Sequence, residues 1–134
     1  RSPRQRSRPV MLVITPTREL AQQIDEVASK IADVTGHVAV TVVGGVSYKP
    51  QTAALKYGCD ILVATPGRLV DLIEQGACHL DEVKVLVLDE ADRMLDMGFL
   101  PAVRRIVRET PAERQTLLFS ATLDEEAVGE ITTW

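Results

Sequence analysis

Short apolar runs recur along the chain, and longer stretches of mixed apolar and polar residues separate them. The runs are four to six residues long and mostly Val, Ile and Leu. Runs of this kind are typical of strands buried on both faces of a parallel sheet. The predicted strands are 10–14, 38–43, 61–64, 83–88 and 116–119.

The stretches between the runs predict helices. In the longest of them apolar residues recur every three or four positions, as in an amphipathic helix. These residues are Leu20, Ile24, Val27, Ile31 and Val34. Shorter helices are predicted at 50–57, at 68–75, which Gly76 ends, and at 101–108, which Pro111 keeps from continuing. Residues 95–98 are predicted to be a break, and Asp124 is a candidate N-cap for a last helix.

Strands that alternate with helices predict an α/β fold with a parallel sheet and right-handed crossovers. The length of 134 residues favours a single domain. A content of 46% hydrophobic and 25% charged residues is that of an ordinary globular domain. No apolar run approaches the roughly 20 residues of a membrane-spanning helix, and no signal peptide is expected behind the Arg- and Pro-rich beginning. We therefore expect no membrane partner.

The charges are unevenly distributed. A net charge of −4 does not indicate a nucleic-acid binder. It does not exclude one either, because a site built from backbone N–H groups needs few basic side chains. Residues 1–9 hold four arginines among Ser and Pro, so we expect a flexible segment, either a solvated connector or a nucleic-acid contact. The folded domain is expected to span 10–134.

Cys59 and Cys78 are far apart in the sequence, which favours reduced thiols in an intracellular protein, cytoplasmic or nuclear.

Acidic residues follow the fourth predicted strand without a break. Asp89, Glu90 and Asp92 stand where ligands bind in open α/β sheets, at the carboxyl end of a strand. Carboxylates at that place suit a divalent cation, a water to be activated, or both. The alternative, an interaction with the helix dipole, accounts for Asp92 better than for Asp89.

Two strand ends share one local sequence. Residues 14–18 and 64–68 both read as strand, Thr-Pro, small residue, Arg, helix. Pro restricts the residue before it to extended geometry and presets the first helical turn. Both places should therefore present a helix N-terminus at one edge of the sheet, which suits a nucleic-acid phosphate. Two ordinary strand-to-helix turns without a ligand are the alternative.

In combination these segments resemble the motifs of a known family. The segments are 16–21 (Pro-Thr-Arg-Glu-Leu-Ala), 44–45 (Gly-Gly), 65–68 (Thr-Pro-Gly-Arg), 89–92 (Asp-Glu-Ala-Asp) and 120–122 (Ser-Ala-Thr). In order and approximate spacing they resemble the first RecA-like domain of the DEAD-box RNA helicases. Each string alone is weak evidence, whereas five in order are strong. The resemblance implies a three-layer α/β/α domain of the P-loop NTPase type.

The resemblance also implies roles for individual residues. Asp89 would hold Mg²⁺ through water beside the phosphates of ATP, and Glu90 would activate the attacking water. Asp92 would pair with Ser120 and Thr122 to couple the ATP state to unwinding. RNA binding, indifferent to base sequence, would fall to Pro16, Thr17, Arg18, Gly45, Thr65, Gly67 and Arg68.

The chain departs from the family pattern in one major respect. No G-x-x-x-x-G-K-[ST] loop, which cradles the phosphates of ATP, occurs in the sequence. The family's adenine-reading motif and second RecA-like domain are also missing. We therefore expect a fragment of the first domain that does not hydrolyse ATP by itself. We also expect the fifth strand to be an apolar sheet edge able to pair with another chain.

Two other readings stay open. A non-enzymatic RNA-binding module would keep the phosphate-binding turns without ATP chemistry. A different P-loop ATPase with chance motifs is the third and least favoured reading.

Overall fold

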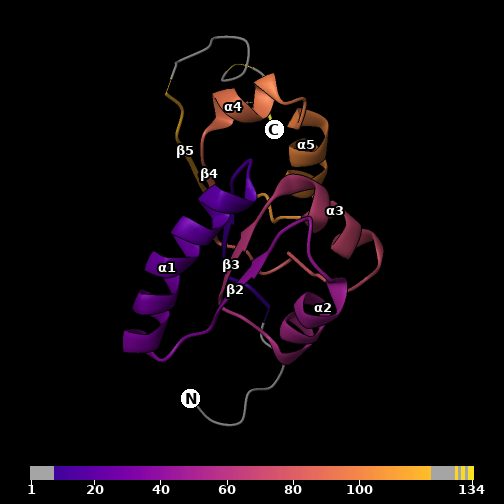
Figure 1. Cartoon of the computed structure of the whole chain (residues 1–134). Coiled ribbons are helices and arrows are strands. Elements are labelled where there is room, and N and C mark those ends of the chain that lie inside the picture. The colour runs from indigo at the N-terminus through magenta and orange to yellow at the C-terminus, as the bar shows by residue number, and fades with distance from the viewer. Residues whose placement is uncertain (1–7, 122–128, 130, 132) are drawn as a thin grey trace.

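Five parallel strands form the centre of the molecule (Figure 1). The computed structural model describes residues 8–121, 129, 131, 133 and 134. The strands lie in the order β2-β3-β1-β4-β5, so β2 and β5 are the edges. Their bounds are β1 Met11–Ile14, β2 Ala39–Val42, β3 Ile61–Ala64, β4 Val85–Leu88 and β5 Gln115–Leu118. All five predicted strands are confirmed, with ends shifted by at most two residues.

Helices connect the strands. They are α1 Arg18–Thr35, α2 Tyr48–Tyr57, α3 Pro66–Glu74, α4 Ala91–Asp96 and α5 Leu100–Arg108. The sequence predicted four of them and missed α4, the short helix that follows the acidic residues. The predicted last helix lies largely outside the described residues, as do the arginines at positions 1, 4 and 6.

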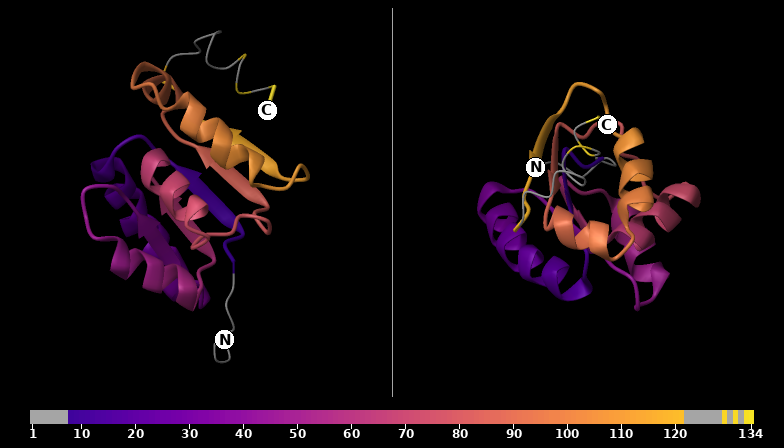
Figure 2. Two further views of the ribbon diagram at one scale, coloured as in Figure 1. Left: turned by 90° about the vertical axis from the view of Figure 1, so that its right-hand side faces the viewer. Right: turned by 90° about the horizontal axis from the view of Figure 1, so that it is seen from above.

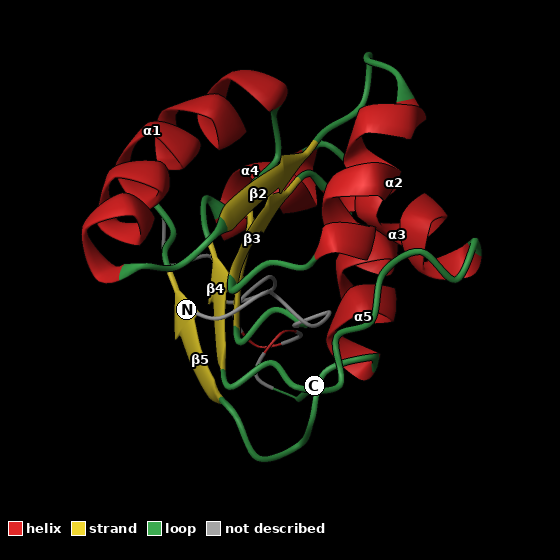
Figure 3. Ribbon diagram, turned by 90° about the horizontal axis from the view of Figure 1, so that it is seen from below, coloured by secondary structure: helices red, strands yellow, loops and turns green. Residues whose placement is uncertain are grey.

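The helices cover the two faces of the sheet unequally. In the view from below, α1 lies on one side of the strands, and α2, α3 and α5 lie on the other (Figure 3). Figure 2 shows the same layers after further turns of the molecule. The three-layer α/β/α arrangement predicted from the family resemblance is therefore present.

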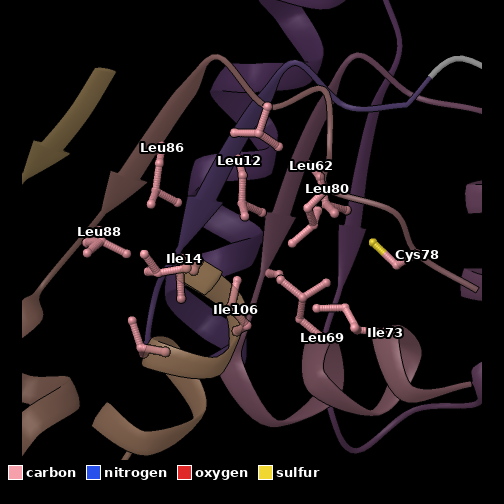
Figure 4. Close-up of a cluster of buried hydrophobic side chains, with 14 of the residues drawn as sticks. Leu12, Ile14, Leu62, Leu69, Ile73, Cys78, Leu80, Leu86, Leu88 and Ile106 are labelled. Atoms are coloured by element: carbon pink, nitrogen blue, oxygen red, sulfur yellow. The ribbon is translucent and has the colours of Figure 1, made fainter. Parts of the chain in front are cut away.

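The larger core lies under α3 and α5. Alternate residues of each strand point to one face of a sheet, and Leu12, Leu62 and Leu86 share this face at the same level of the register. They are fully buried against Leu69 of α3 and Ile106 of α5 (Figure 4). Burying one such Leu side chain contributes about 1.5–3 kcal/mol to stability.

The opposite face of the sheet is covered mainly by α1. Val13, Val63 and Val87 pack there, against Ala21 and Ala28 of the helix. Small side chains on α1 let the helix approach the strands closely. The wider apolar stripe that predicted the helix is only partly covered. Val27, Ile31 and Val34 are 60%, 52% and 85% exposed.

One edge of the sheet is poorly covered. Leu117 and Phe119, on or next to β5, are 37% and 54% exposed.

Across the described residues, no helix is long and apolar enough to cross a membrane.

Candidate functional site

The carboxyl ends of all five strands meet at one edge of the sheet, because every neighbouring pair is parallel. We call the residues that follow these ends the rim. They are 15–18, 44–46, 65–68, 89–92 and 119–121. Main-chain bonds extend the strand register into it. The N–H of Thr15 donates to Ala64 O at 3.0 Å, and the N–H of Thr65 donates to Val42 O at 3.1 Å. The N–H of Asp89 donates to Ile14 O at 2.9 Å.

Thr17 is the N-cap of α1. Its backbone is extended, and its side chain accepts a hydrogen bond from the N–H of Leu20 at 3.2 Å. This cap satisfies one donor of the first turn, so the remaining N–H groups stay available at the rim. Arg18, the first helical residue, is exposed beside them.

Thr65 and Pro66 form the corresponding turn at the start of α3. Thr65 is extended, Pro66 occupies the first turn of the helix, and Gly67 is exposed next to it. Unlike Thr17, Thr65 makes no capping bond with its side chain. The two helices therefore begin at different positions of the shared sequence: α1 begins at its Arg, whereas α3 begins two positions earlier, at its Pro.

The Gly-Gly turn lies against the first of these helix starts. Gly45 has φ +81°, a conformation that glycine adopts at little cost. A Cβ placed on Gly45 would come within 3.0 Å of Arg18 Nη1. The absence of a side chain thus lets Arg18 lie across the turn, and two motifs 27 positions apart in the sequence form one surface.

Arg68 occupies a different position from the one expected of a phosphate contact. It is only 8% exposed. Its Nη1 donates to Gln51 Oε1 and its Nη2 to Val46 O, both at 2.9 Å. Its guanidinium also stacks on the ring of Tyr48, 3.8 Å from the centroid. The guanidinium of Arg68 therefore binds groups of the protein itself, including the loop that follows Gly45.

Gln51 and Tyr48 complete this support, and sequence reasoning missed both. Gln51 is buried in α2 and donates from Nε2 to Val43 O at 3.0 Å. The hydroxyl of Tyr48 donates to Asp71 Oδ2 on α3 at 2.7 Å. This hydrogen bond, the largest cause, raises the pKa of Tyr48 above its ordinary value. Neither residue belongs to a recognisable pattern in the sequence, so no sequence signal distinguished them.

Asp89 and Glu90 lie at the end of β4, on the rim. Burial, and secondly the charge of Glu90, raise the pKa of Asp89 above the ordinary aspartate value. Two neighbouring, partly buried carboxylates favour a bound cation, because a positive charge would stabilise the ionised form that burial and the charge of Glu90 disfavour. Asp89 is half-buried and still reaches solvent, which fits contact with Mg²⁺ through water. Among the described residues no cluster of three or more His, Cys, Asp or Glu side chains is arranged around a common metal position.

Glu90 has an unusual backbone. Its φ is +54° and its ψ +53°, which makes it the one described residue other than glycine with positive φ. This conformation turns the chain from β4 directly into α4. The side chain lies 3.7 Å from Arg93 Nη1. Non-glycine residues held in the left-handed region are found preferentially at functional sites.

The end of β5 lies beside this turn. The N–H of Ala91 donates to Phe119 O at 3.0 Å. Asp92 and Ser120, each one residue further along the chain, are therefore brought to the same place on the rim. Thr122 lies outside the described residues.

Comparisons with known proteins agree with this architecture. The model of the DEAD/DEAH box helicase family matches residues 2–131. The chain is 53% identical over 129 residues to ATP-dependent RNA helicase RhlB of Pseudomonas putida, covering 94% of this chain and 32% of that protein. It is 55% identical over 114 residues to DEAD-box ATP-dependent RNA helicase 5 of Oryza sativa subsp. japonica, covering 85% and 22%.

A solved structure of a DEAD-box protein also matches the chain. The crystal structure of the yeast DEAD-box splicing factor Prp28 superposes with a TM-score of 0.87 at 37% identity, covering 95% of this chain and 30% of Prp28. A RecA-like α/β domain with this rim defines the class, and the chain belongs to the DEAD/DEAH box helicase family. It spans about a third of the length of the first relatives it matches.

Proposed function

We propose that this chain is part of the first RecA-like domain of an ATP-dependent RNA helicase and that its rim binds the RNA backbone. The observation that carries the proposal is the arrangement of the rim, where two helix starts and a glycine turn lie at one edge of the sheet and the exposed Arg18 lies against the turn. The names of the relatives at about half identity support it. A second RecA-like domain would supply the rest of the nucleotide site in the complete protein.

RNA phosphates would be held by backbone N–H donors and by the positively charged side chain of Arg18. The N–H groups at the start of α1 and α3 attract anions, and Arg18 adds a full charge. Direct contacts are proposed for the exposed or partly exposed Thr17, Arg18, Gly45 and Gly67, whereas Pro16 and Thr65 are buried and would act by fixing the backbone of the two turns. Arg68 acts from inside, because it holds the loop after Gly45 in place. Contacts of this kind carry no base information, so binding should be independent of RNA sequence.

ATP chemistry is proposed for the acidic side of the rim in the complete protein. Magnesium bound there neutralises charge on the phosphates. Asp89 would orient it through water, and Glu90 would accept the proton of the attacking water. Asp92, Ser120 and Thr122 would link this half of the rim to the RNA half.

A non-enzymatic RNA-binding module is the second candidate. It would use the phosphate-binding turns of the rim without ATP chemistry, whereas the retained Asp89 and Glu90 favour the helicase. The flanking coding sequence decides between them. An upstream phosphate-binding loop supports the helicase, and its absence from the complete gene supports the module.

Titration of fluorescein-labelled single-stranded RNA, followed by anisotropy, tests RNA binding directly. We expect oligonucleotides of different sequence to bind alike, with an affinity that falls as salt is raised. The variant Arg18→Gln should bind more weakly than the wild-type chain. A wild-type chain that leaves the anisotropy unchanged at low salt would contradict the proposal.

A further inference from the structure

A second basic site lies away from the rim. It is a hollow of about 520 Å³ between α5 and the beginning of β5. We call it the arginine hollow. Its polar lining consists of Arg104, Arg108, Arg114, Thr110, Thr116 and Thr133, and Trp134 forms an aromatic wall. Arg114 precedes β5 and Thr116 is its second residue. The hollow therefore lies towards the amino ends of the strands, opposite the rim.

Two arginines of the hollow have no acidic partner. Arg104 and Arg108 are exposed, four residues apart on α5, and so lie on one side of the helix. Within the described part of the chain neither of the two side chains makes a hydrogen bond or an ion pair. Like charges at this spacing oppose helix formation. The neighbouring Arg105, in contrast, pairs with Glu109 at 3.1 Å. Helix α5 thus neutralises one arginine and leaves uncompensated the two that line the hollow.

The third arginine is fixed in place. Arg114 donates from Nε to Thr116 Oγ1 at 3.1 Å and from Nη1 to Pro111 O at 2.9 Å. These bonds orient the guanidinium and leave its Nη2 donors for a ligand. The segment 104–114 contains four arginines and, as acids, only Glu109 and Glu113, so it remains positive.

Trp134 supplies a flat surface beside these charges. It is half-buried, packs against the large core and lines the hollow. A hollow lined by both guanidinium groups and an aromatic side chain suits single-stranded nucleic acid, because phosphates can meet the charges and a base can stack on the ring.

We propose that the arginine hollow is a second binding site for single-stranded RNA, with phosphates on Arg104, Arg108 and Arg114 and a base on Trp134. The inference rests on the proposed function, since it gives the same ligand a further point of attachment. The hollow and the rim lie at opposite ends of the strands, so an RNA must be long enough to reach both if it is to gain from the second site.

The fluorescence of Trp134 provides a local test, because this chain contains a single tryptophan. RNA of about 20 nucleotides, longer than the roughly 4–16 that single-strand-binding folds cover, is titrated into the whole chain. We expect quenching of Trp134 at the RNA concentrations that raise the anisotropy. In Arg104→Gln/Arg108→Gln the quenching should disappear, the affinity should fall about tenfold at low salt, and the salt slope should fall by about 1.4.

The control Lys30→Gln/Lys56→Gln removes the same charge from exposed positions on α1 and α2, and should keep the quenching. Arg18→Gln separates the two proposals, because it weakens the rim and leaves quenching of Trp134 in place. Fluorescence that stays constant while RNA saturates the chain would overturn the second site. Quenching by a phosphorylated peptide or by inorganic phosphate, with none by RNA, would overturn the choice of RNA as the ligand.

Discussion

Arg18 Nη1 lies 3.0 Å from the point that a Cβ on Gly45 would occupy. Gly45 also has φ +81°. A side chain at this position therefore meets two obstacles, the left-handed backbone and the guanidinium of Arg18. Gly44, one residue earlier, has no atom within 4 Å of its own Cβ position. The two glycines of the turn are equivalent in the sequence and differ in the structure.

Gly45→Ala should lower the free energy of unfolding by about 1 kcal/mol, because alanine is strained at positive φ. It should also weaken RNA binding, because the methyl group displaces Arg18. Gly44→Ala is the matched control, and we expect it to alter neither quantity appreciably. Urea denaturation and RNA anisotropy measure the two effects. Equal behaviour of the two variants would contradict the assigned contact.

Arg18 and Arg68 should respond differently to substitution, although both arginines stand in Thr-Pro turns. Arg18→Gln removes one exposed charge, so the salt slope of RNA binding should fall by about 0.7 while stability stays unchanged. Arg68→Gln leaves the buried Gln51 Oε1 unpaired and removes the bond to Val46 O, so the free energy of unfolding should fall by about 1–3 kcal/mol. Its salt slope should change less. If Arg68→Gln melts like the wild type and its salt slope of RNA binding falls as in Arg18→Gln, Arg68 is instead a direct RNA contact.

Asp89 should lower the stability of the folded chain at neutral pH. The pKa of Asp89 is raised on folding, so its contribution to stability is present below the ordinary carboxyl pKa and is lost as the pH rises through the folded value. Asp89→Asn should therefore unfold at a higher temperature than wild type at pH 7, and this advantage should shrink in acid. Asp96→Asn, at an exposed position in α4, controls for the lost charge. An advantage that grows on acidification would contradict the assignment.

The chain should not hydrolyse ATP by itself. Asp89 and Glu90 are present, but no G-x-x-x-x-G-K-[ST] loop cradles the phosphates. Phosphate release from ATP and Mg²⁺, with and without RNA, should equal that of a Glu90→Gln variant. Turnover that disappears in the Glu90→Gln variant would refute this expectation.

Strand β5 should mediate self-association. The N–H groups of Gln115 and Phe119 donate to Lys84 O, just before β4, and to Leu88 O at its end. The N–H of Thr116 therefore points away from the sheet, with Leu117 exposed beside it. Light scattering should show dimers at high concentration and their loss in Leu117→Lys. Val34→Lys changes an equally apolar and more exposed residue on α1, and should leave association unchanged. A chain that remains monomeric at high concentration would argue against pairing through this edge.

The three central strands could be predicted because burial on both faces leaves an apolar run. The helices other than α4 could be predicted from the stretches between the runs, where apolar residues recur at helical spacing in α1. Helix α4 could not, since its buried residues Ala91 and Met94 give too short a pattern. The stripe on α1 predicted the helix correctly, but the residues that touch the sheet most closely are alanines, which hydropathy weighs lightly.

The site was predictable in its composition and less so in its geometry. Parallel strands bring their following residues to one edge, which a sequence pattern suffices to indicate. Burial of Arg68 was not foreseeable, because arginine is usually exposed. Its partners Gln51 and Tyr48 are set by the packing of α2 against α3 and not by local sequence. The left-handed backbone of Glu90 was not foreseeable either, because this conformation is uncommon for residues other than glycine.

Hydrogen exchange of the chain with and without a short single-stranded RNA tests the central claim most directly. We expect slower exchange together at 17–21, 44–46 and 67–69, which begin α1, form the glycine turn and begin α3. RNA that binds the chain and leaves all three segments unprotected would contradict an RNA site on the rim.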